Sequence, residues 1–536
     1  MIQVNTSQRT SKPRCSLRRQ SLSWPGAALV GVLVAVAGCS GGADSSESAS
    51  ESAESDGPAV IEKMTMRLQE PVAVLDPAIN VGNATGQIRI LTAGQLYRQD
   101  RDGVPQPELV ESSETSDDGL TMTMTLKPDL VYSDDTPLVA GDVVAMYERS
   151  ILGREGGSPF YTPFVEEVTA PDDLTVVWSL LQPYAQLPLA TALSELLLHP
   201  AEAMEDENYF QAPVSAGPYM IENFSPGDQV MNLVENPNYV GGPLMIKAIE
   251  SITIPDVTQT ALQLVSGDLD FAFGLPYSFP GATEGQSDIN VLMHPTGGVF
   301  QLGLNTTKGG PLGDPKVRQA MSLAIDRQEI AEKAFLNVTE VNPAWVFATD
   351  PFYSSVLPKD GARDVEAARA LLAETPYADG FEFTMDTFGV RDGHNATVLL
   401  IKEQLAELGI TVTANPLEIP TALERLNNNT FEAFFQGSVA PSGPSVMTVS
   451  FCPSGVWGRW MPSGNPEICE MAITAMGEDD PTETLVRAQE LAIESMPIIP
   501  LVNRRDVVGT RVPVEIFGPV ANTPWLAVAT MESMGL

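Results

Sequence analysis

Alternating apolar and polar residues predict two β-strands in the first half of the chain. The segments Thr121–Leu126 (TMTMTL) and Thr175–Leu180 (TVVWSL) alternate with a period of two, as strands with one buried face do. Each follows a stretch of turn-forming residues, DDG at 117–119 and PDD at 171–173. We therefore expect two short strands, bounded by turns, in a sheet that is buried on one face.

Helical periodicity dominates the second half of the chain. Asp314 precedes Pro315, the order that favours an N-cap residue followed by the first helical position. Apolar residues then recur at helical spacing, at Val317, Ala320, Met321, Ala324 and Ile325. Asp326 and Glu329 form an acidic version of the capping box that starts the next helix. Further helices are predicted at 364–372, 394–408, 420–426 and Thr482–Ser495. Short strands among punctuated helices predict an α/β fold class.

The first 38 residues have the layout of a secretory signal peptide. Residues 1–38 contain basic side chains and no acidic one, and their apolar stretch at 27–37 is too short to span a bilayer. Small residues at 36–38 precede Cys39, an order that resembles the bacterial lipobox. Cys39 is therefore the expected site of lipidation. An ordinary signal peptide with an incidental cysteine is the alternative.

Residues 39–58 predict a flexible tether. They are rich in Ser, Glu, Ala, Asp and Gly and contain no large apolar residue that could be buried. The folded body is expected to begin near Ala59, and no later run approaches the roughly 18 apolar residues of a membrane-spanning helix. We expect a protein of the cell envelope, outside the cytoplasm and anchored in the membrane by lipid at Cys39.

Composition narrows the class of partner. The 536 residues include 43% hydrophobic and 18% charged residues, which suits a globular body rather than a disordered chain. There are 30 Lys and Arg against 69 Asp and Glu, a formal net charge of -39. Such a field repels phosphate backbones, so nucleic-acid binding is excluded. We expect the protein to be a monomer.

The sequence gives little support for a metal, a cofactor or catalysis. His199, His294 and His394 are scattered, with no cluster at metal-ligand spacing, and no cofactor-binding motif occurs. The acid pairs at 134–135 and 479–480 leave a secreted acid/base hydrolase as an alternative. Adjacent acids in an extended chain point to opposite faces, and in an acidic protein they are usually solvated turns. We therefore do not expect an enzyme.

Two cysteines lie in the body, Cys452 and Cys469. Outside the cytoplasm a pair 17 residues apart, separated by Pro, Gly and Ser, could close a disulfide around a loop. Two unpaired cysteines in the core are the alternative.

Several short segments, taken in order, resemble one protein family. They include LDP at 75–77, AGPY at 216–219, NPNY at 236–239, VRQA at 317–320, AIDR at 324–327 and MPIIPL at 496–501. Each segment is weak evidence alone, but their order from about residue 65 to 510 is similar to that of the family 5 extracellular solute-binding proteins of bacterial ABC importers. The dipeptide-binding branch of this family also has a similar cysteine pair.

The resemblance implies a two-lobed α/β fold of the periplasmic-binding-protein type. Lobe one would hold residues 59–298 plus 500–536, with an extra subdomain near 98–208, and lobe two would hold 299–499. The chain would cross the hinge twice, near 299–304 and 498–502. Such a protein captures a solute between its lobes and delivers it to the permease and ATPase subunits of an importer.

A short peptide is the solute that the resemblance favours, with a non-peptide solute such as an oligosaccharide as the alternative. The family's peptide binders have an acid for the peptide ammonium at the place of residues 436–442, where this chain has none. Arg391 lies where the dipeptide-binding branch has an arginine for the peptide carboxylate, and a solvated loop charge is its alternative role.

An enclosed cleft also needs aromatic walls and a few polar groups. The candidates are Trp345, Tyr353, Phe388, Phe435, Ser438, Trp457 and Trp460. Packing in the core is the alternative for each of the aromatic side chains.

Overall fold

The computed structural model describes most of the chain after the N-terminal region. The described residues are 59–534 apart from 73, 80–82, 154–157, 159, 226, 346–360, 439–442, 454, 456, 459–465, 479, 522 and 524–525. In this part of the chain no helix combines the length and apolarity needed to cross a membrane.

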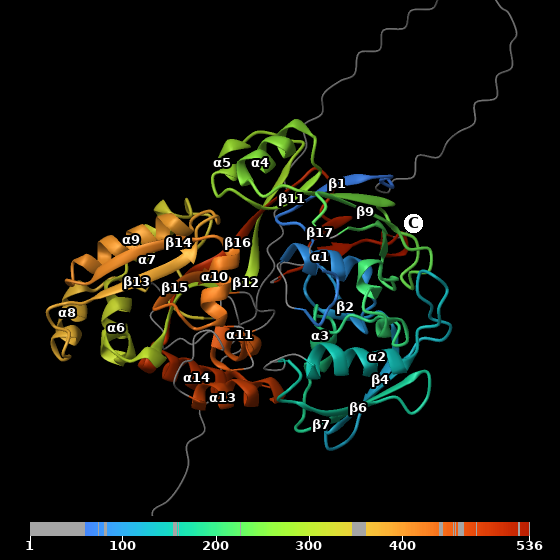
Figure 1. The fold of residues 1–536 in the computed structure, drawn as a ribbon, viewed down its shortest axis with the longest axis horizontal. Helices are drawn as coiled ribbons and strands as arrows, with labels where there is room; N and C mark the ends of the chain where they lie inside the picture. Colours follow the sequence, from blue (N-terminus) through green and yellow to red (C-terminus); the bar gives the residue numbers. More distant parts are fainter. Residues whose placement is uncertain are drawn as a thin grey trace, which may run out of the picture. The chain divides into compact units, whose positions relative to one another are not determined.

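A ten-stranded mixed sheet organises the body (Figure 1). Its strands lie in the order β14 (Thr411–Leu417), β13 (Glu382–Phe388), β15 (Ala433–Gly437), β12 (Asn290–Leu304), β16 (Ile498–Thr510), β11 (Phe271–Leu275), β1 (Met64–Leu68), β10 (Ala248–Thr253), β9 (Val230–Glu235) and β8 (Tyr219–Asn223). The fold class is therefore α/β, as the pattern of strands and helices predicted.

Two long antiparallel strands, β12 and β16, form the middle of this sheet. Their pairing runs from Asn290 opposite Thr510 to Gly303 opposite Ile498, and its register shifts between Pro295 and Val299. β12 also pairs with β15, and β16 with β11, so each of the two strands faces a different half of the sheet. The strands join the halves near the residues where the resemblance implied two hinge crossings; the exact lobe boundaries stay a prediction.

Each half of the sheet contains parallel strands connected through helices. On one side β13 pairs in parallel with both β14 and β15, and the connections run through α9 (His394–Ala406) and α10 (Ile419–Asn427). On the other side β1 pairs in parallel with β10 and β11, which α4 (Val257–Ser266) connects. Helices that connect parallel strands cover the faces of the sheet, so its strands are largely buried.

The remaining helices are short, and three of them begin at an aspartate cap. They are α1 (Asn83–Thr92), α2 (Ala140–Tyr147), α3 (Leu187–Thr191), α5 (Phe279–Ala282), α6 (Pro315–Ala324), α7 (Arg327–Lys333), α8 (Val365–Ala373), α11 (Gly443–Phe451), α13 (Pro466–Gly477) and α14 (Thr482–Ser495). Asp314, Asp326 and Asp364 accept bonds from the backbone N–H groups of the first turns of α6, α7 and α8. These are the starts that the sequence predicted.

A separate four-stranded antiparallel sheet contains both strands predicted from alternation. Its order is β4 (Val110–Thr115), β5 (Thr121–Leu126), β7 (Thr175–Leu180) and β6 (Val165–Thr169). The apolar side chains of β5 and β7 are buried with α2 around Trp178, which stacks on Tyr161 with ring centres 6.2 Å apart. Two smaller pairs complete the strands, β2 (Tyr97–Gln99) with β3 (Pro105–Pro107) and β17 (Phe517–Pro519) with β18 (Leu526–Val528).

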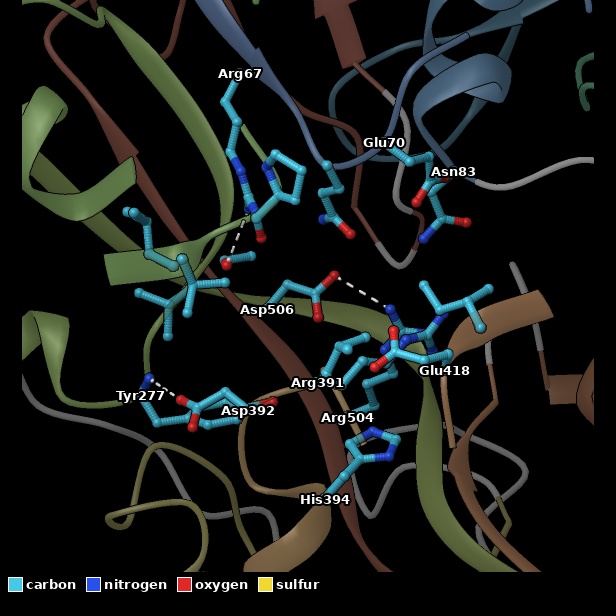
Figure 2. Close-up of a pocket in the computed structure, with 18 of the residues that line it drawn as sticks. Arg67, Glu70, Asn83, Tyr277, Arg391, Asp392, His394, Glu418, Arg504 and Asp506 are labelled. Atoms are coloured by element: carbon cyan, nitrogen blue, oxygen red, sulfur yellow. Dashed lines mark hydrogen bonds and ion pairs between the residues drawn. The ribbon is translucent and has the colours of Figure 1, made fainter. Parts of the chain in front are cut away.

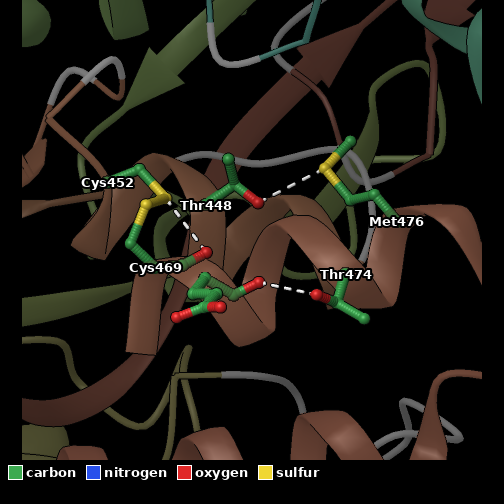
Figure 3. Close-up of a disulfide and its surroundings, with 6 residues drawn as sticks. Thr448, Cys452, Cys469, Thr474 and Met476 are labelled. Carbon is green, nitrogen blue, oxygen red and sulfur yellow. Dashed lines mark hydrogen bonds between the residues drawn. A yellow bond between two sulfur atoms is a disulfide. The ribbon is translucent and has the colours of Figure 1, made fainter. Parts of the chain in front are cut away.

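A disulfide joins the end of α11 to α13 (Figure 3). Cys452 follows the last residue of α11, Cys469 lies in the first turns of α13, and their Cα atoms are 4.8 Å apart. One turn of helix earlier, the hydroxyl of Thr448 donates to the Sδ of Met476 at 3.3 Å, so the two helices are held at both ends of their contact. The disulfide therefore joins two positions 17 residues apart in the chain.

Removing this disulfide should destabilise the protein by about 3 kcal/mol, because a closed loop of this size restricts the unfolded chain. The change is the double substitution Cys452→Ala and Cys469→Ala, measured by urea unfolding. Wild-type protein unfolded in the presence of a reductant is the matched control and should lose the same free energy. Equal stability of the oxidised wild type and the variant would contradict the prediction.

Candidate functional site

A cavity of about 350 Å³ opens beside the two long strands (Figure 2). Its walls come from the segment after β1, the segment after β11, the strands β12 and β16, the loop between β13 and α9, and the start of α10. The charged or polar side chains among its lining are Arg67, Gln69, Glu70, Asn83, Tyr277, Arg391, Asp392, His394, Glu418, Arg504 and Asp506. Residues from both halves of the sheet therefore meet around one space.

Arg391 presents an open cation to this cavity. Its guanidinium lies over the ring of Phe388, 4.3 Å from the ring centre, and makes no ion pair with a described residue. The side chain stays exposed on the cavity side. Withdrawal from bulk water and the nearby charge of Arg504 lower the pKa of Arg391 to about 10, so it is still charged at neutral pH.

The loop that carries Arg391 is fixed by the next residue. Asp392 accepts a 2.8 Å bond from the backbone N–H of Tyr277 and a 3.0 Å bond from that of Gly393. Tyr277 in turn packs edge-on against Phe335, with ring centres 5.0 Å apart. Gly393 has φ +74°, and a Cβ there would come within 2.7 Å of the Phe335 ring. A larger residue at 393 would therefore displace this corner of the cavity.

Two other arginines of the cavity are held by the protein itself. Arg67 is buried and donates to the backbone carbonyls of residues 254, 255, 273 and 274. Arg504 on β16 pairs with Asp506 at 3.4 Å, and both side chains are largely buried. These groups shape the wall, and Arg391 is the more open cation.

His394 lies beneath the wall as a neutral ring. It is 2% exposed, its Nδ1 is 2.9 Å from the hydroxyl of Thr387, and its ring is 4.9 Å from that of Phe435. Burial, together with the charges of Arg391 and Arg504, holds the pKa of His394 well below its usual value. The imidazole adds no charge to the cavity at neutral pH.

Two carboxylates of the cavity have few partners. Glu70, after β1, accepts a 3.3 Å bond from the backbone N–H of Ala84 and makes no ion pair with a described residue. Glu418 precedes the first residue of α10, is exposed, and makes no side-chain capping bond. Figure 2 shows Glu70 and Asn83 on one side of the cavity and Glu418 close to the arginines on the other.

Most of the predicted aromatic residues that the structure describes are packed in the protein. Trp345 is fully buried against Phe451, and Phe435 is fully buried in the main core. Phe388 is 3% exposed, and its ring lies against the guanidinium of Arg391. Trp457 is half-buried and packs against the small apolar cluster that contains Phe388. These aromatic side chains follow the alternative of core packing. Of the predicted ligand-binding residues that the structure describes, only Arg391 lines the cavity.

Ser438 has a backbone role at the end of β15. Its hydroxyl accepts a 3.0 Å bond from the N–H of Val299, and its own N–H donates to the carbonyl of Val299 at 2.8 Å. Tyr353, Trp460 and the lipidation candidate Cys39 lie outside the described residues. Among the residues that the structure describes, no group of His, Cys, Asp and Glu could hold a metal ion.

Sequence reasoning missed Glu70, Glu418, Arg504 and Asp506. Arg504 and Asp506 interrupt the apolar sequence in the middle of β16, and charged residues inside a central strand are a signal that could have been used. Glu70 and Glu418 carry no such signal, because the fold brings them together from positions almost 350 residues apart.

The profile described as "Bacterial extracellular solute-binding proteins, family 5 Middle" matches residues 104–456. The chain belongs to family 5 of the bacterial extracellular solute-binding proteins. This confirms the family that the ordered sequence segments indicated. Because proteins of this family bind solutes, membership also supports a binding protein over the alternative of a hydrolase.

Two relatives illustrate the range of this family 5 protein's matches. It is 30% identical over 266 residues to a probable D,D-dipeptide-binding periplasmic protein of Escherichia coli, an alignment that covers 47% of the chain and 51% of the relative. It is 24% identical to a glutathione-binding protein of Salmonella paratyphi A, over 76% of the chain and 82% of the relative. The chain thus spans about half the length of the first relative and most of the second.

The fold matches a solved structure over nearly its whole length. The binding protein DppA of Helicobacter pylori, in complex with the peptide STSA, superimposes with a TM-score of 0.77 at 19% identity. The match covers 89% of the chain and 98% of DppA. This confirms the two-lobed periplasmic-binding-protein fold of the family 5 protein.

Lowering the pH should destabilise the protein partly through His394. A histidine whose pKa is lower in the folded than in the unfolded chain stabilises above the unfolded value, and this contribution is lost as pH falls below about 6.5. One such group costs about 1.4 kcal/mol per pH unit in that range. The variant His394→Gln should show a shallower loss of unfolding free energy between pH 7.5 and 5.5, measured with urea.

His294→Gln is a comparison variant and should make the pH curve shallower in the same direction, because burial also lowers the pKa of His294. If the unfolding free energies of wild type and His394→Gln fell in parallel with pH, the pKa of His394 would not be lowered in the folded protein.

Proposed function

We propose that this family 5 protein is a membrane-anchored receptor that captures a short extracellular peptide and delivers it to the permease and ATPase subunits of an ABC importer. The observation that carries the proposal is the open guanidinium of Arg391 in a cavity lined from both halves of the sheet. A planar, permanently charged fork of donors suits a carboxylate. The relatives above include proteins named for binding a D,D-dipeptide and glutathione, and the solved homologue holds a peptide.

The arrangement of the cavity supports capture between lobes. We propose that residues 59–298 plus 500–536 form lobe one, with the four-stranded sheet in its subdomain near 98–208, and that residues 299–499 form lobe two. On this division Glu70 and Tyr277 come from lobe one, and Arg391 and Asp392 from lobe two. A solute bound by both walls would then favour the closed arrangement of the lobes.

The roles proposed for the other predicted residues follow from their places. Phe388 supports Arg391 through its ring face, and Ser438 fixes the end of β15 beside β12. Trp345, Phe435 and Trp457 would act by packing behind the wall, and Tyr353 and Trp460 remain candidates for direct contact.

A non-peptide solute is the second candidate. The residues at 436–442 (QGSVAPS) contain no acid, whereas the family's peptide binders hold the peptide ammonium with an acid at this place. An oligosaccharide or another solute with a carboxylate would leave the role of Arg391 unchanged.

Loss of the Arg391 guanidinium should weaken binding by more than about tenfold, because a charged hydrogen bond contributes roughly 1.5–3 kcal/mol. The ligand is the di- or tripeptide that most raises the melting temperature of the wild type in a thermal-shift screen, and affinity is measured by titration calorimetry. Arg391→Lys should be intermediate, since it keeps the charge and loses the planar fork.

Arg369→Ala is the control, because Arg369 is an exposed arginine of α8 outside the cavity. Unchanged affinity in Arg391→Ala would show that Arg391 is a solvated loop charge and does not bind the solute. Indifference of the wild type to every peptide, with stabilisation by a sugar, would favour the second candidate.

We also propose that lipid on Cys39 anchors the protein. The support is the order of charged, apolar and small residues before Cys39 and the polar tether after it. Cys39→Ser should move the protein from the membrane to the soluble fraction of cells, detected by immunoblot. Cys15→Ser, in the same leader, should leave it with the membrane; a membrane-bound Cys39→Ser protein would argue against acylation.

A further inference from the structure

The charges of the cavity differ in how far the protein itself satisfies them. Arg67 donates to four backbone carbonyls, Arg504 is paired with Asp506, and Asp392 accepts from two backbone N–H groups. These side chains have partners in the folded chain before any solute binds. They add to the field of the cavity but do not need a counter-charge from a ligand.

Three other side chains make no ion pair with a described residue. They are the guanidinium of Arg391 and the carboxylates of Glu70 and Glu418. Glu70 and Arg391 line the same cavity, so one solute can contact both groups. Figure 2 shows these side chains around the same space. A bound solute can therefore supply one negative group and one or more positive groups.

The balance of charge around the cavity is slightly negative. Its lining includes three arginines and four carboxylates, and His394 is neutral. A solute with one carboxylate and one ammonium, the ends of an ordinary peptide, would leave this surplus negative charge unmatched. A second positive group on the solute would match it. Charges withdrawn from water interact strongly, so such a mismatch weakens binding.

We propose that the cavity selects a zwitterionic solute with one additional positive charge, such as a dipeptide that contains lysine or arginine. Its carboxylate binds Arg391, and its cationic nitrogens bind Glu70 and Glu418. These two acids thus take the place of the acid that is missing at 436–442. The inference rests on the proposed function, because it assigns a class of solute to the same receptor.

Glu418 also has an ordinary structural role to be separated from this one. A carboxylate at the start of α10 is stabilised by the helix dipole whether or not a solute binds. That role predicts a lower melting temperature in Glu418→Gln without any change in the choice between solutes. Selection by charge predicts a change in that choice.

The test measures the affinity of the full-length protein for Lys-Leu, Met-Leu and Glu-Leu by titration calorimetry. Lysine and methionine side chains are similar in length, so the first pair isolates the added charge. Wild type should bind Lys-Leu at least about tenfold more tightly than Met-Leu, and Glu-Leu most weakly. Glu418→Gln and Glu70→Gln should each reduce the preference for Lys-Leu several-fold. Glu424→Gln, an exposed acid of the same helix outside the cavity, should not.

Equal affinity for Lys-Leu and Met-Leu in the wild type, or an unchanged preference in both cavity variants, would overturn the proposal and leave the receptor function standing. If no dipeptide binds, the peptide assignment fails, and native mass spectrometry of the purified protein decides the charge class. A co-purifying zwitterion with an extra positive charge would support the proposal. An anionic or uncharged solute, or none, would overturn it.

Discussion

The pairing of β12 with β16 is the constraint on which the rest of the structure depends. These strands are the only link in the ten-stranded sheet between the half built on β13 and the half built on β1, within the described residues. Phe300 on β12 and Arg504 and Asp506 on β16 form the floor of the cavity. A shift in this register would move the floor relative to both walls, and by an odd number of residues it would turn these side chains to the opposite face.

Buried arginines hold the neighbouring helices to this pair. Arg318 of α6 donates to the carbonyls of Ser495 and Met496, and Arg327 of α7 donates to that of Pro500. Both arginines belong to the segments VRQA and AIDR by which the sequence resembled the family. The segments therefore have a physical purpose: they attach two helices to the backbone where β16 begins. Burial lowers the pKa of each to about 10, which leaves them charged and strongly hydrogen-bonded.

Local patterns predicted local structure well and the cavity only in part. The bounds of β5, β7 and α14 agree with the alternation and periodicity of the sequence, and aspartates cap α6, α7 and α8 where expected, because these signals depend on neighbouring residues. Arg391 was found because it lies where the dipeptide-binding branch has an arginine. Glu70 and Glu418 were not found, because only the tertiary fold brings a loop after β1 next to the start of α10. The sequence could not show that Trp345 and Phe435 are core residues and not cavity-lining residues, because an aromatic residue occurs in similar apolar sequence in both places.

The corner formed by Tyr277, Phe335 and Asp392 connects the loop of Arg391, the proposed binding residue, to the segment before β12. Tyr277 precedes β12, whereas Asp392 lies in the loop after β13, so the bond between them joins segments on opposite sides of the long strands. The same carboxylate holds the loop that presents Arg391. Opening the cavity along the long strands would have to break or move this bond, and with it the support of the guanidinium. On the proposed function, a solute that binds Arg391 and the wall carrying Glu70 would stabilise the arrangement in which this bond is made, and binding and closure would be linked through one short loop.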